Sequence, residues 1–341
     1  MLWIGVQSEM SVNQIQDISN SRVSLDRIRI AREIIDPVFR NTPQYRCEPL
    51  SSIVGVDLTL KVETCNPIRS FKGRGADFLV GSSKEKHLIC ASAGNFGQAM
   101  AYACRKKHVL LTVFASTNAN SYKIERMRSL GAEVILAGED FDAAKVEARK
   151  EAVRTGLPMI EDALAIETLE GAGTIGLEML EDGVPESVRQ HMVTLDALLI
   201  PLGNGALFNG VARVFKELSP QTKMIAVQAA GAPSMLDSWR ENRVIVYEKI
   251  DTIADGIGVR IPIPQALQDM RGLADEGITV REESILVGMK LLHVHAGLVS
   301  EPSAAVGIAA ILENKSRFAG MKVATIICGG NLTEAQIKAW L

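Results

Sequence analysis

HLICASAGNFGQAMAYACRK, at residues 87–106, contains the unit from which we expect the fold to be built. A short apolar strand over 87–91 leads into a turn of small residues and then into a helix over 95–106. Short apolar runs that alternate with helices are typical of parallel strands buried on both faces. The stretch therefore favours the α/β class.

The same order of strand, small-residue turn and helix recurs along most of the chain. Alternating polar and apolar residues predict one more strand over 57–63, and a Pro- and Gly-punctuated loop over 64–76 opens a helix. Further strands are predicted at 109–114, 132–136, 197–201, 223–228 and 322–328. Helices are predicted over 24–40, 120–130, 141–155, 167–181, 206–218, 283–295 and 303–314. We therefore expect parallel sheets covered by helices.

Composition narrows the class of protein. The 341 residues are 47% hydrophobic and 23% charged, as in a globular protein, and the net charge of -3 gives no reason to expect nucleic acid or an acidic membrane as partner. No apolar run reaches the ~18 residues of a membrane span, and the first ten residues lack the pattern of a signal peptide. No CxxC occurs, so we expect reduced thiols in a cytoplasm at Cys47, Cys65, Cys90, Cys104 and Cys328.

The first turn that could bind a ligand is SFKGRGA, at residues 70–76. Its Lys72 stands between a phenylalanine and a glycine at the start of a helix, where backbone lets a ligand approach closely. A partly desolvated lysine loses its proton more easily, as a Schiff-base nucleophile must. The alternative is a surface lysine in a basic turn with Arg69 and Arg74, and most lysines are solvated.

The second turn follows the strand at 87–91. Ser92, Gly94 and Asn95 would present free backbone N–H groups at a helix N-terminus, which suits a carboxylate. As an ordinary helix N-cap, Ser92 or Asn95 would need no ligand. Both interpretations stay open on this segment alone.

The third turn is PLGNGALFNG, at residues 201–210, where a strand again leads into a helix. Its small residues could hold a phosphate with backbone N–H groups and the helix dipole. A dinucleotide fingerprint fits less well, because the glycine spacing is G-x-G-x4-G and the next strand ends at Gln228 rather than at an acidic residue. The sequence predicts a phosphate site without a ribose.

The fourth turn is IICGGN, at residues 326–331, which could place the neutral thiol of Cys328 against a ligand or bury it as a small hydrophobe. Other polar segments carry weaker signals. His293 and His295 are two residues apart and do not share a helix face, so we expect no metal site there. The charge-rich segment SYKIERMR, at 121–128, is most simply a solvated helix face.

Together and in this order, the four turns resemble those of the fold-type-II pyridoxal-phosphate enzymes (the tryptophan synthase beta-like superfamily). The resemblance runs from about residue 40 to residue 335 and includes GAGTIGLEML, DTIADGIGV and EPSAAVGIAAIL at 171–180, 251–259 and 301–312. The motifs are most similar to those of threonine and serine dehydratases. The resemblance implies pyridoxal 5'-phosphate as cofactor.

Transferred position by position, the resemblance implies roles for individual residues. Lys72 would carry the cofactor as a Schiff base and move the proton, with Phe71 against the ring. Cys328 would face the pyridine nitrogen, and Asn95 would hydrogen-bond the phenolic oxygen. The substrate carboxylate would be held by Ser92, Ala93, Gly94, Asn95 and Phe96, and the cofactor phosphate by Gly203, Asn204, Gly205, Ala206 and Leu207.

Departures within the family bear on the reaction. Ala93 replaces the second serine of serine racemase and has no proton to exchange, which argues against racemisation. A neutral Cys328 makes the ring a poorer electron sink, which suits elimination better than transamination. Phe96 replaces a frequent histidine, and the phosphate turn departs from the GGGG of dehydratases. Gln228 and the residues after it lack the acidic ligands of a divalent cation, so we expect no metal.

The function implied is a cytoplasmic ammonia-lyase that converts a 3-hydroxy amino acid, such as L-threonine or L-serine, to a 2-oxo acid and ammonia. The alternatives are a β-replacement enzyme and a non-catalytic pyridoxal-phosphate-binding protein. We expect two open, mostly parallel α/β domains: a large cofactor-binding domain of residues 1–83 and 166–341, and a small mobile domain of 84–165. A homodimer is implied, and no effector-binding module is expected after Leu341.

Overall fold

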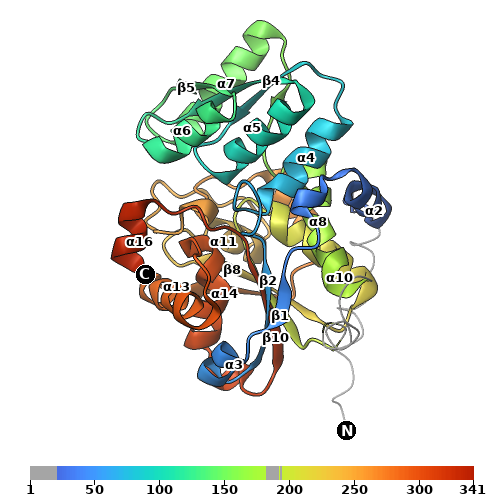
Figure 1. Cartoon of the computed structure of the whole chain (residues 1–341), viewed down its shortest axis with the longest axis vertical. Helices are drawn as coiled ribbons and strands as arrows, with labels where there is room; N and C mark the ends of the chain where they lie inside the picture. Colours follow the sequence, from blue (N-terminus) through green and yellow to red (C-terminus); the bar gives the residue numbers. More distant parts are fainter. Residues whose placement is uncertain (1–20, 182–191, 193) are drawn as a thin grey trace.

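Two separate sheets, each with helices packed against it, make up the computed structural model (Figure 1). The structure describes residues 21–181, 192 and 194–341, so the segment examined for a signal peptide lies outside the described residues. The larger sheet has six strands in the order β1-β2-β10-β7-β8-β9, and the smaller has four in the order β5-β4-β3-β6. Every strand pair is parallel except β1–β2. The predicted class, α/β with two mostly parallel sheets, is confirmed.

The four-stranded sheet has helices on both faces because its strands are apolar on both faces. In β3, Leu88 and Cys90 belong to the core shared with α5, whereas Ile89 and Ala91 belong to the core shared with α7. This alternation follows from the two-residue period of a strand. Its strands are β3 (His87–Ala91), β4 (Leu110–Ala115), β5 (Glu133–Leu136) and β6 (Met159–Ile160), and its helices are α5 (Asn95–Lys107), α6 (Ser121–Ser129) and α7 (Phe141–Thr155).

The six-stranded sheet is covered by α8 and α10 on one side and by α13 and α14 on the other (Figure 1). Its strands are β1 (Gln44–Arg46), β2 (Asp57–Val62), β7 (Ala197–Pro201), β8 (Lys223–Ala229), β9 (Glu276–Val280) and β10 (Lys322–Ile327). The covering helices are α8 (Ile166–Leu180), α10 (Ala206–Leu218), α13 (Glu282–Ala296) and α14 (Pro302–Glu313). Strands β7 and β10 are buried along most of their length, as expected for central parallel strands.

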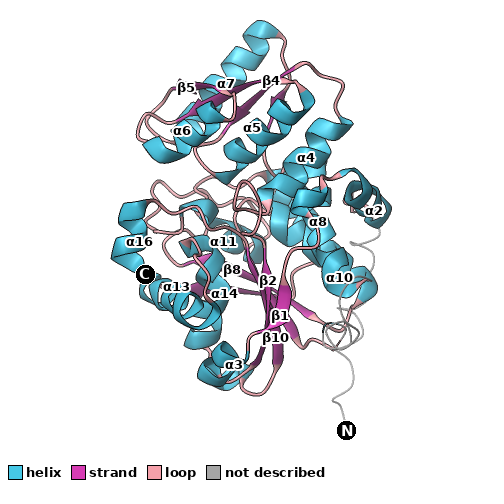
Figure 2. Ribbon diagram, in the orientation of Figure 1, coloured by secondary structure: helices cyan, strands magenta, loops and turns pink. Residues whose placement is uncertain are grey.

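Helix α4 (Lys72–Ser82) lies between the two halves and packs against both α5 and α8. Glycines permit the close approach to α8, because a Cβ at Gly75 would lie 2.8 Å from the backbone of Thr168. The start of α4 is therefore held where the two sheets face each other, in the middle of Figure 2. The residue boundaries proposed for two domains, at 84 and 165, stay a prediction.

Some elements differ from those predicted. The helix predicted over 24–40 is α2 (Leu25–Ile34), followed by the short 3₁₀ helix η1 (Pro37–Phe39). The chain leaves the helix because Pro37 disfavours the helical conformation at Asp36. Strands β1, β6 and β9 were not predicted. Nor were the helices α3 (Glu48–Val54), α11 (Ser234–Arg240), α12 (Pro264–Met270), α15 (Lys315–Phe318) and α16 (Glu334–Trp340) and the 3₁₀ helix η2 (Asp255–Ile257).

Within the described part of the chain, no helix combines the length and the apolar composition needed to cross a membrane.

Candidate active site

The ligand-binding turns predicted from the sequence meet at one edge of the six-stranded sheet. Strands β7 and β10 are neighbours and parallel, with Val323 beside Ala197, so the turns that follow them leave the sheet at the same edge. Strand β2 lies on the other side of β10 and is parallel to it, and it leads toward α4. The turns that carry Gly203, Cys328 and Lys72 are therefore brought together.

Lys72 is held at this edge by the loop before it. The backbone N–H of Phe71 donates to the carbonyl of Cys328 at 3.1 Å, and Ser70 pairs with Gly329 as an isolated bridge. The amide oxygen of Asn66 accepts hydrogen bonds from the backbone N–H groups of Ile68 and Ser70, which orders the turn. The Lys72 side chain is only 16% exposed. It is not the surface lysine of the alternative interpretation.

Lys72 has a partner that the sequence did not indicate. Its Nζ lies 2.5 Å from Oδ2 of Asp162, in the segment that follows β6. The Nζ also lies 4.6 Å from the centroid of the Phe71 ring. No motif or periodic pattern marked Asp162, because the contact joins residues 90 positions apart.

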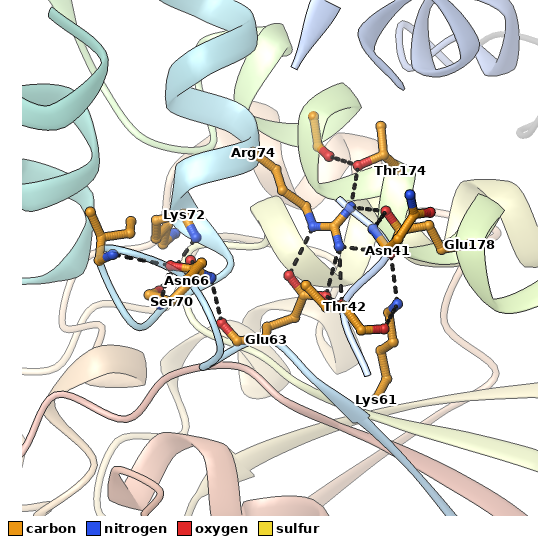
Figure 3. A network of polar contacts seen from close by, with 12 residues as sticks. Asn41, Thr42, Lys61, Glu63, Asn66, Ser70, Lys72, Arg74, Thr174 and Glu178 are labelled. Atoms are coloured by element: carbon orange, nitrogen blue, oxygen red, sulfur yellow. Dashed lines mark hydrogen bonds and ion pairs between the residues drawn. The ribbon is translucent and has the colours of Figure 1, made fainter. Parts of the chain in front are cut away.

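A buried charge network holds α4 from the other side (Figure 3). Arg74 is fully buried, which excludes the surface position considered for it. Its guanidinium donates to Oε2 of Glu63 at 2.8 Å and to Oε1 of Glu178 at 2.6 Å. Lys61, also buried, donates to Oε2 of Glu178 at 2.7 Å. Thr42 completes the network by donating to Oε1 of Glu63 at 2.5 Å.

The charges of the network set its protonation. Burial alone would raise the pKa of Glu178, but the charges of Arg74 and Lys61 outweigh burial and lower that pKa to about 2. Burial lowers the pKa of Lys61 despite the attraction of Glu178 and Glu63. Because Arg74 and Lys72 belong to the same first turn of α4, these contacts fix the backbone from which Lys72 extends.

The turn after β3 reaches the same edge. Asn95 Nδ2 donates to Oε1 of Glu301 at 2.8 Å, and Asn95 Oδ1 accepts from Nδ2 of Asn331 at 2.8 Å. The N-cap of α5 is Gly94, and the Ser92 hydroxyl accepts hydrogen bonds from the backbone N–H groups of Gly94 and, in the first turn of α5, Gly97. The Ser92 hydroxyl therefore has partners in its own turn, and its predicted contact with a substrate carboxylate stays a prediction, as does that of Ala93 and Phe96.

Glu301 is a buried carboxyl at the centre of this arrangement. Burial raises its pKa to about 7, Asp255 adds to the shift, and Lys123 opposes it. A Cβ at Gly329 would lie 2.3 Å from its Oε1, so the turn after β10 depends on glycine there. The segment 301–312 was part of the family resemblance, but the sequence did not predict that the carboxyl group of Glu301 accepts a hydrogen bond from Asn95.

The turn after β7 forms a cradle of backbone. Gly205 has φ +102°, which favours glycine, and no side chain caps the N-terminus of α10. A Cβ at Gly203 would lie 3.2 Å from the carbonyl of Gly256, and one at Gly256 would lie 2.6 Å from the hydroxyl of Ser303. That hydroxyl is buried and has no hydrogen-bond partner among the described residues. Uncapped N–H groups at a helix start suit a phosphate.

Cys328, at the end of β10, is buried. Burial raises the pKa of its thiol well above the ordinary range, Glu301 raises it further, and Lys72 lowers it. The thiol is therefore neutral at physiological pH. Its neighbours at this edge are Lys72 and the turn of Gly329.

Lys123 corrects the prediction that SYKIERMR is a solvated face. Its side chain is 8% exposed, and its ammonium forms an ion pair with Asp255. Ile124 and Met127 of the same helix are also buried. Charged residues alone could not show this, because the position of α6 against η2 depends on the tertiary fold.

These residues fit pyridoxal 5'-phosphate. An amine suits its aldehyde, an uncapped helix start after two glycines suits its phosphate, and a neutral thiol suits an unprotonated ring nitrogen. The buried, unpartnered Ser303 hydroxyl beside the cradle is a further donor. Among the described residues, no three His, Cys, Asp or Glu side chains gather as a metal site would require.

The profile of the family described as pyridoxal-phosphate dependent enzyme matches residues 35–329. An L-threonine ammonia-lyase of Thermotoga maritima is 34% identical over 314 residues, which cover 91% of this chain and 76% of that protein. A catabolic L-threonine dehydratase of Staphylococcus aureus is 31% identical over 337 residues, 96% of this chain and 95% of that protein.

Solved structures give the same picture. Maize serine racemase superposes with a TM-score of 0.84 at 27% identity, covering 93% of this chain and 96% of its own. Threonine deaminase isoform 2 of Solanum lycopersicum superposes with a TM-score of 0.80 at 28% identity, covering 98% of this chain and 93% of its own.

Proposed function

This chain belongs to the family of pyridoxal-phosphate dependent enzymes, and on that premise we propose that it is an ammonia-lyase acting on a 3-hydroxy amino acid, with L-threonine or L-serine as substrate. The membership confirms the family resemblance seen in the motifs and the cofactor that it implies. The products are a 2-oxo acid and ammonia. The names of the relatives from Thermotoga maritima and Staphylococcus aureus support this choice of reaction.

The observation that carries the proposal is the meeting of Lys72 with Cys328 at one sheet edge. The backbone N–H beside Lys72 donates to the Cys328 carbonyl, so the amine and the neutral thiol are fixed relative to each other. If the Cys328 thiol faces the ring nitrogen of the cofactor, it does not keep that nitrogen protonated, because a neutral thiol lacks the negative charge of a carboxylate. Loss of a β-substituent together with the α-proton suits that setting better than transamination does.

In the proposed elimination, different residues bind the cofactor, bind the substrate and remove the α-proton. Lys72 attaches the cofactor, which when bound withdraws electrons from the substrate Cα. The backbone N–H groups from Gly203 to Leu207 hold the phosphate at the start of α10. The backbone from Ser92 to Phe96, at the start of α5, holds the substrate carboxylate. Lys72 then removes the proton from Cα, and the hydroxyl leaves Cβ.

Racemisation and β-replacement fit the residues less well. Ala93 carries a methyl group and has no proton to exchange on the opposite face of the substrate, so we propose that the protein does not share the activity of maize serine racemase. β-Replacement requires a second substrate that supplies the nucleophile. Ammonia released from a single amino acid distinguishes elimination from β-replacement.

The test is a steady-state assay on the protein loaded with pyridoxal phosphate. We expect L-threonine or L-serine alone to yield ammonia and a 2-oxo acid in equal amounts, and Lys72→Ala to yield neither. Formation of an S-substituted cysteine from L-serine and an added thiol, without release of ammonia, would move the assignment to β-replacement. No turnover of either amino acid by a fully loaded protein would contradict the proposal.

We also propose a cytoplasmic location and a homodimer. The thiols Cys47, Cys65, Cys90, Cys104 and Cys328 are all free, which is typical of a reducing compartment. The dimer rests on family resemblance alone, and light scattering of the purified protein tests it.

A further inference from the structure

The contact between Lys72 and Asp162 joins two parts of the molecule. Lys72 begins α4, whereas Asp162 follows β6, the edge strand of the four-stranded sheet. The side chains are 16% and 13% exposed, so water competes little for the 2.5 Å contact between Nζ and Oδ2. A hydrogen bond between charged groups of this length allows a proton to pass between them.

The second oxygen of Asp162 is free. Its Oδ1 is buried, and no donor among the described residues reaches it. Asp162 and Lys72 line one small pocket together with Phe71, Phe96 and Thr168. Phe96 belongs to the segment at the start of α5 that is proposed to hold the substrate carboxylate, so this pocket lies beside that proposed site. A buried carboxylate oxygen without a donor is costly unless a ligand supplies one.

The other titratable groups near Lys72 are either neutral or already paired with another residue, unlike Asp162. Cys328, at the end of β10, is neutral and buried. Glu301 and Glu63 both raise the pKa of that thiol, but each carboxyl group has another partner: Glu301 pairs with Asn95 and Glu63 with Arg74. Among the described residues, Asp162 is the carboxylate that forms an ion pair with Lys72.

We propose that Asp162 is a further catalytic residue, which exchanges a proton with Lys72 and returns it to the departing hydroxyl of the substrate. This inference rests on the proposed function, since it assigns the proton donor of the same elimination.

Lys72 and Asp162 together carry one proton from the substrate Cα to the departing hydroxyl, so no further acid or base is needed. The proton on Cα passes to Nζ of Lys72 as the Cα–H bond breaks, and from Nζ to Oδ2 of Asp162. A turn of the carboxyl about its Cβ–Cγ bond brings that proton to the hydroxyl oxygen. The Cβ–O bond breaks, water leaves, and the electrons of the Cα–H bond form the Cα=Cβ double bond. Asp162 is again a carboxylate and Lys72 a neutral amine.

The experiment compares two leaving groups. Hydroxide leaves L-serine only with a proton, whereas chloride leaves 3-chloro-L-alanine without one. The variants are Asp162→Asn, which has nearly the same shape and no titratable group, and Asp162→Glu, which restores the acid. The control is Glu161→Gln, because Glu161 pairs with Arg149 of α7 at 2.8 Å rather than with Lys72.

A second readout needs no turnover. In each variant loaded with pyridoxal phosphate, the visible absorption band is followed against pH. A carboxylate at the Lys72 nitrogen stabilises a positive charge there. We therefore expect the band of Asp162→Asn to change at lower pH than that of the unsubstituted protein and of Glu161→Gln, with equal cofactor content.

We expect Asp162→Asn to lower kcat for L-serine by at least ~100-fold, the usual contribution of a proton donor, and kcat for 3-chloro-L-alanine by less than ~10-fold. Asp162→Glu should recover part of the loss with L-serine. Equal losses on both substrates overturn the proposal, and so does a band whose pH dependence is unchanged in Asp162→Asn. If the unsubstituted protein eliminates from neither substrate, the proposed function fails. In that case the pH dependence of the visible absorption band alone tests the interaction between Asp162 and Lys72: a shift to lower pH in Asp162→Asn supports it, and no shift contradicts it.

Discussion

Lys123 of α6 forms an ion pair with Asp255, the first residue of the 3₁₀ helix η2. The pair joins the half of the molecule built on the four-stranded sheet to the half that carries the phosphate cradle. Asp255 belongs to the second half because the next residue, Gly256, lies against Gly203 of the cradle. Lys123 is buried, whereas Asp255 is 59% exposed. The pair therefore ties the two halves together over the candidate site.

The first prediction concerns this pair. Lys123→Met keeps the length of the side chain and removes its charge. We expect the KM for the amino-acid substrate to rise about fivefold, because an ion pair of ~1 kcal/mol no longer holds the two halves together at the site, with kcat and Tm almost unchanged. Steady-state kinetics and thermal unfolding measure both quantities.

Asp255→Asn and the double variant are the controls for that result. If the two residues act through each other, the double variant has the KM of either single variant. Effects that add would show that Lys123 acts through another partner.

The second prediction concerns the phosphate cradle. In Gly205→Ala a side chain is forced into φ +102°, and its Cβ lies 3.0 Å from the Asn209 amide. The turn must shift, and the N–H groups at the start of α10 lose their alignment. We expect the affinity for pyridoxal phosphate to fall at least tenfold, a loss of ~1.4 kcal/mol. Titration of the cofactor-free protein, followed by absorption, gives the dissociation constant.

Gly131→Ala is the matched control for backbone strain. Gly131 has a similar φ of +93° in the turn before β5, and nothing lies within 4 Å of the added Cβ. We expect Gly131→Ala to lower the free energy of unfolding without changing cofactor affinity. Equal losses of cofactor affinity in the two variants would refute a specific role of the Gly205 turn.

The third prediction concerns the buried network under α4. Glu178→Gln leaves Arg74 and Lys61 buried with less compensating charge. We expect the free energy of unfolding at pH 7 to fall by ~3 kcal/mol, as when one partner of a buried ion pair is removed. Urea unfolding at a series of pH values measures it.

The same experiment tests the charge of Glu178. Its pKa is about 2 in the folded protein and near 4.5 when unfolded, so its contribution is complete above pH 4.5 and is lost as pH falls toward 2. The difference in stability between Glu178→Gln and the unsubstituted protein should therefore shrink over that range. Glu151→Gln, which removes only the pair of Glu151 with the exposed Arg154 on α7, should show a much smaller difference over the same range. A gap that persists at pH 2 would mean that packing rather than charge causes the loss.

The strands and turns of the sheets could be predicted because their signals are local. The strands at 87–91 and 197–201 begin and end as predicted, since each is an apolar run ended by small residues. Strand β9 escaped prediction because it lies at a sheet edge and is only half buried. The helix over 24–40 was predicted too long because its apolar spacing continues past the point at which Pro37 ends it.

The candidate site likewise contains residues that a local motif indicates and residues that only the tertiary fold reveals. Lys72, Asn95 and the Gly203 turn lie in glycine-rich segments at strand ends, where residue types and spacing mark a candidate site, although only the ordered set of segments favoured a ligand over ordinary caps and turns. Asp162 and Lys123 act through partners 90 and 132 positions away, and a single sequence carries no sign of such pairs. The partners became visible only when the two halves of the fold were placed together.

The most direct test of the account is the identity of the lysine that carries the cofactor. The protein loaded with pyridoxal phosphate is reduced with borohydride and digested, and the labelled peptide is sequenced by mass spectrometry. The account predicts one labelled residue, Lys72, and no label in Lys72→Ala. A label on another lysine, such as the buried Lys123, or no label in the unsubstituted protein, would contradict it.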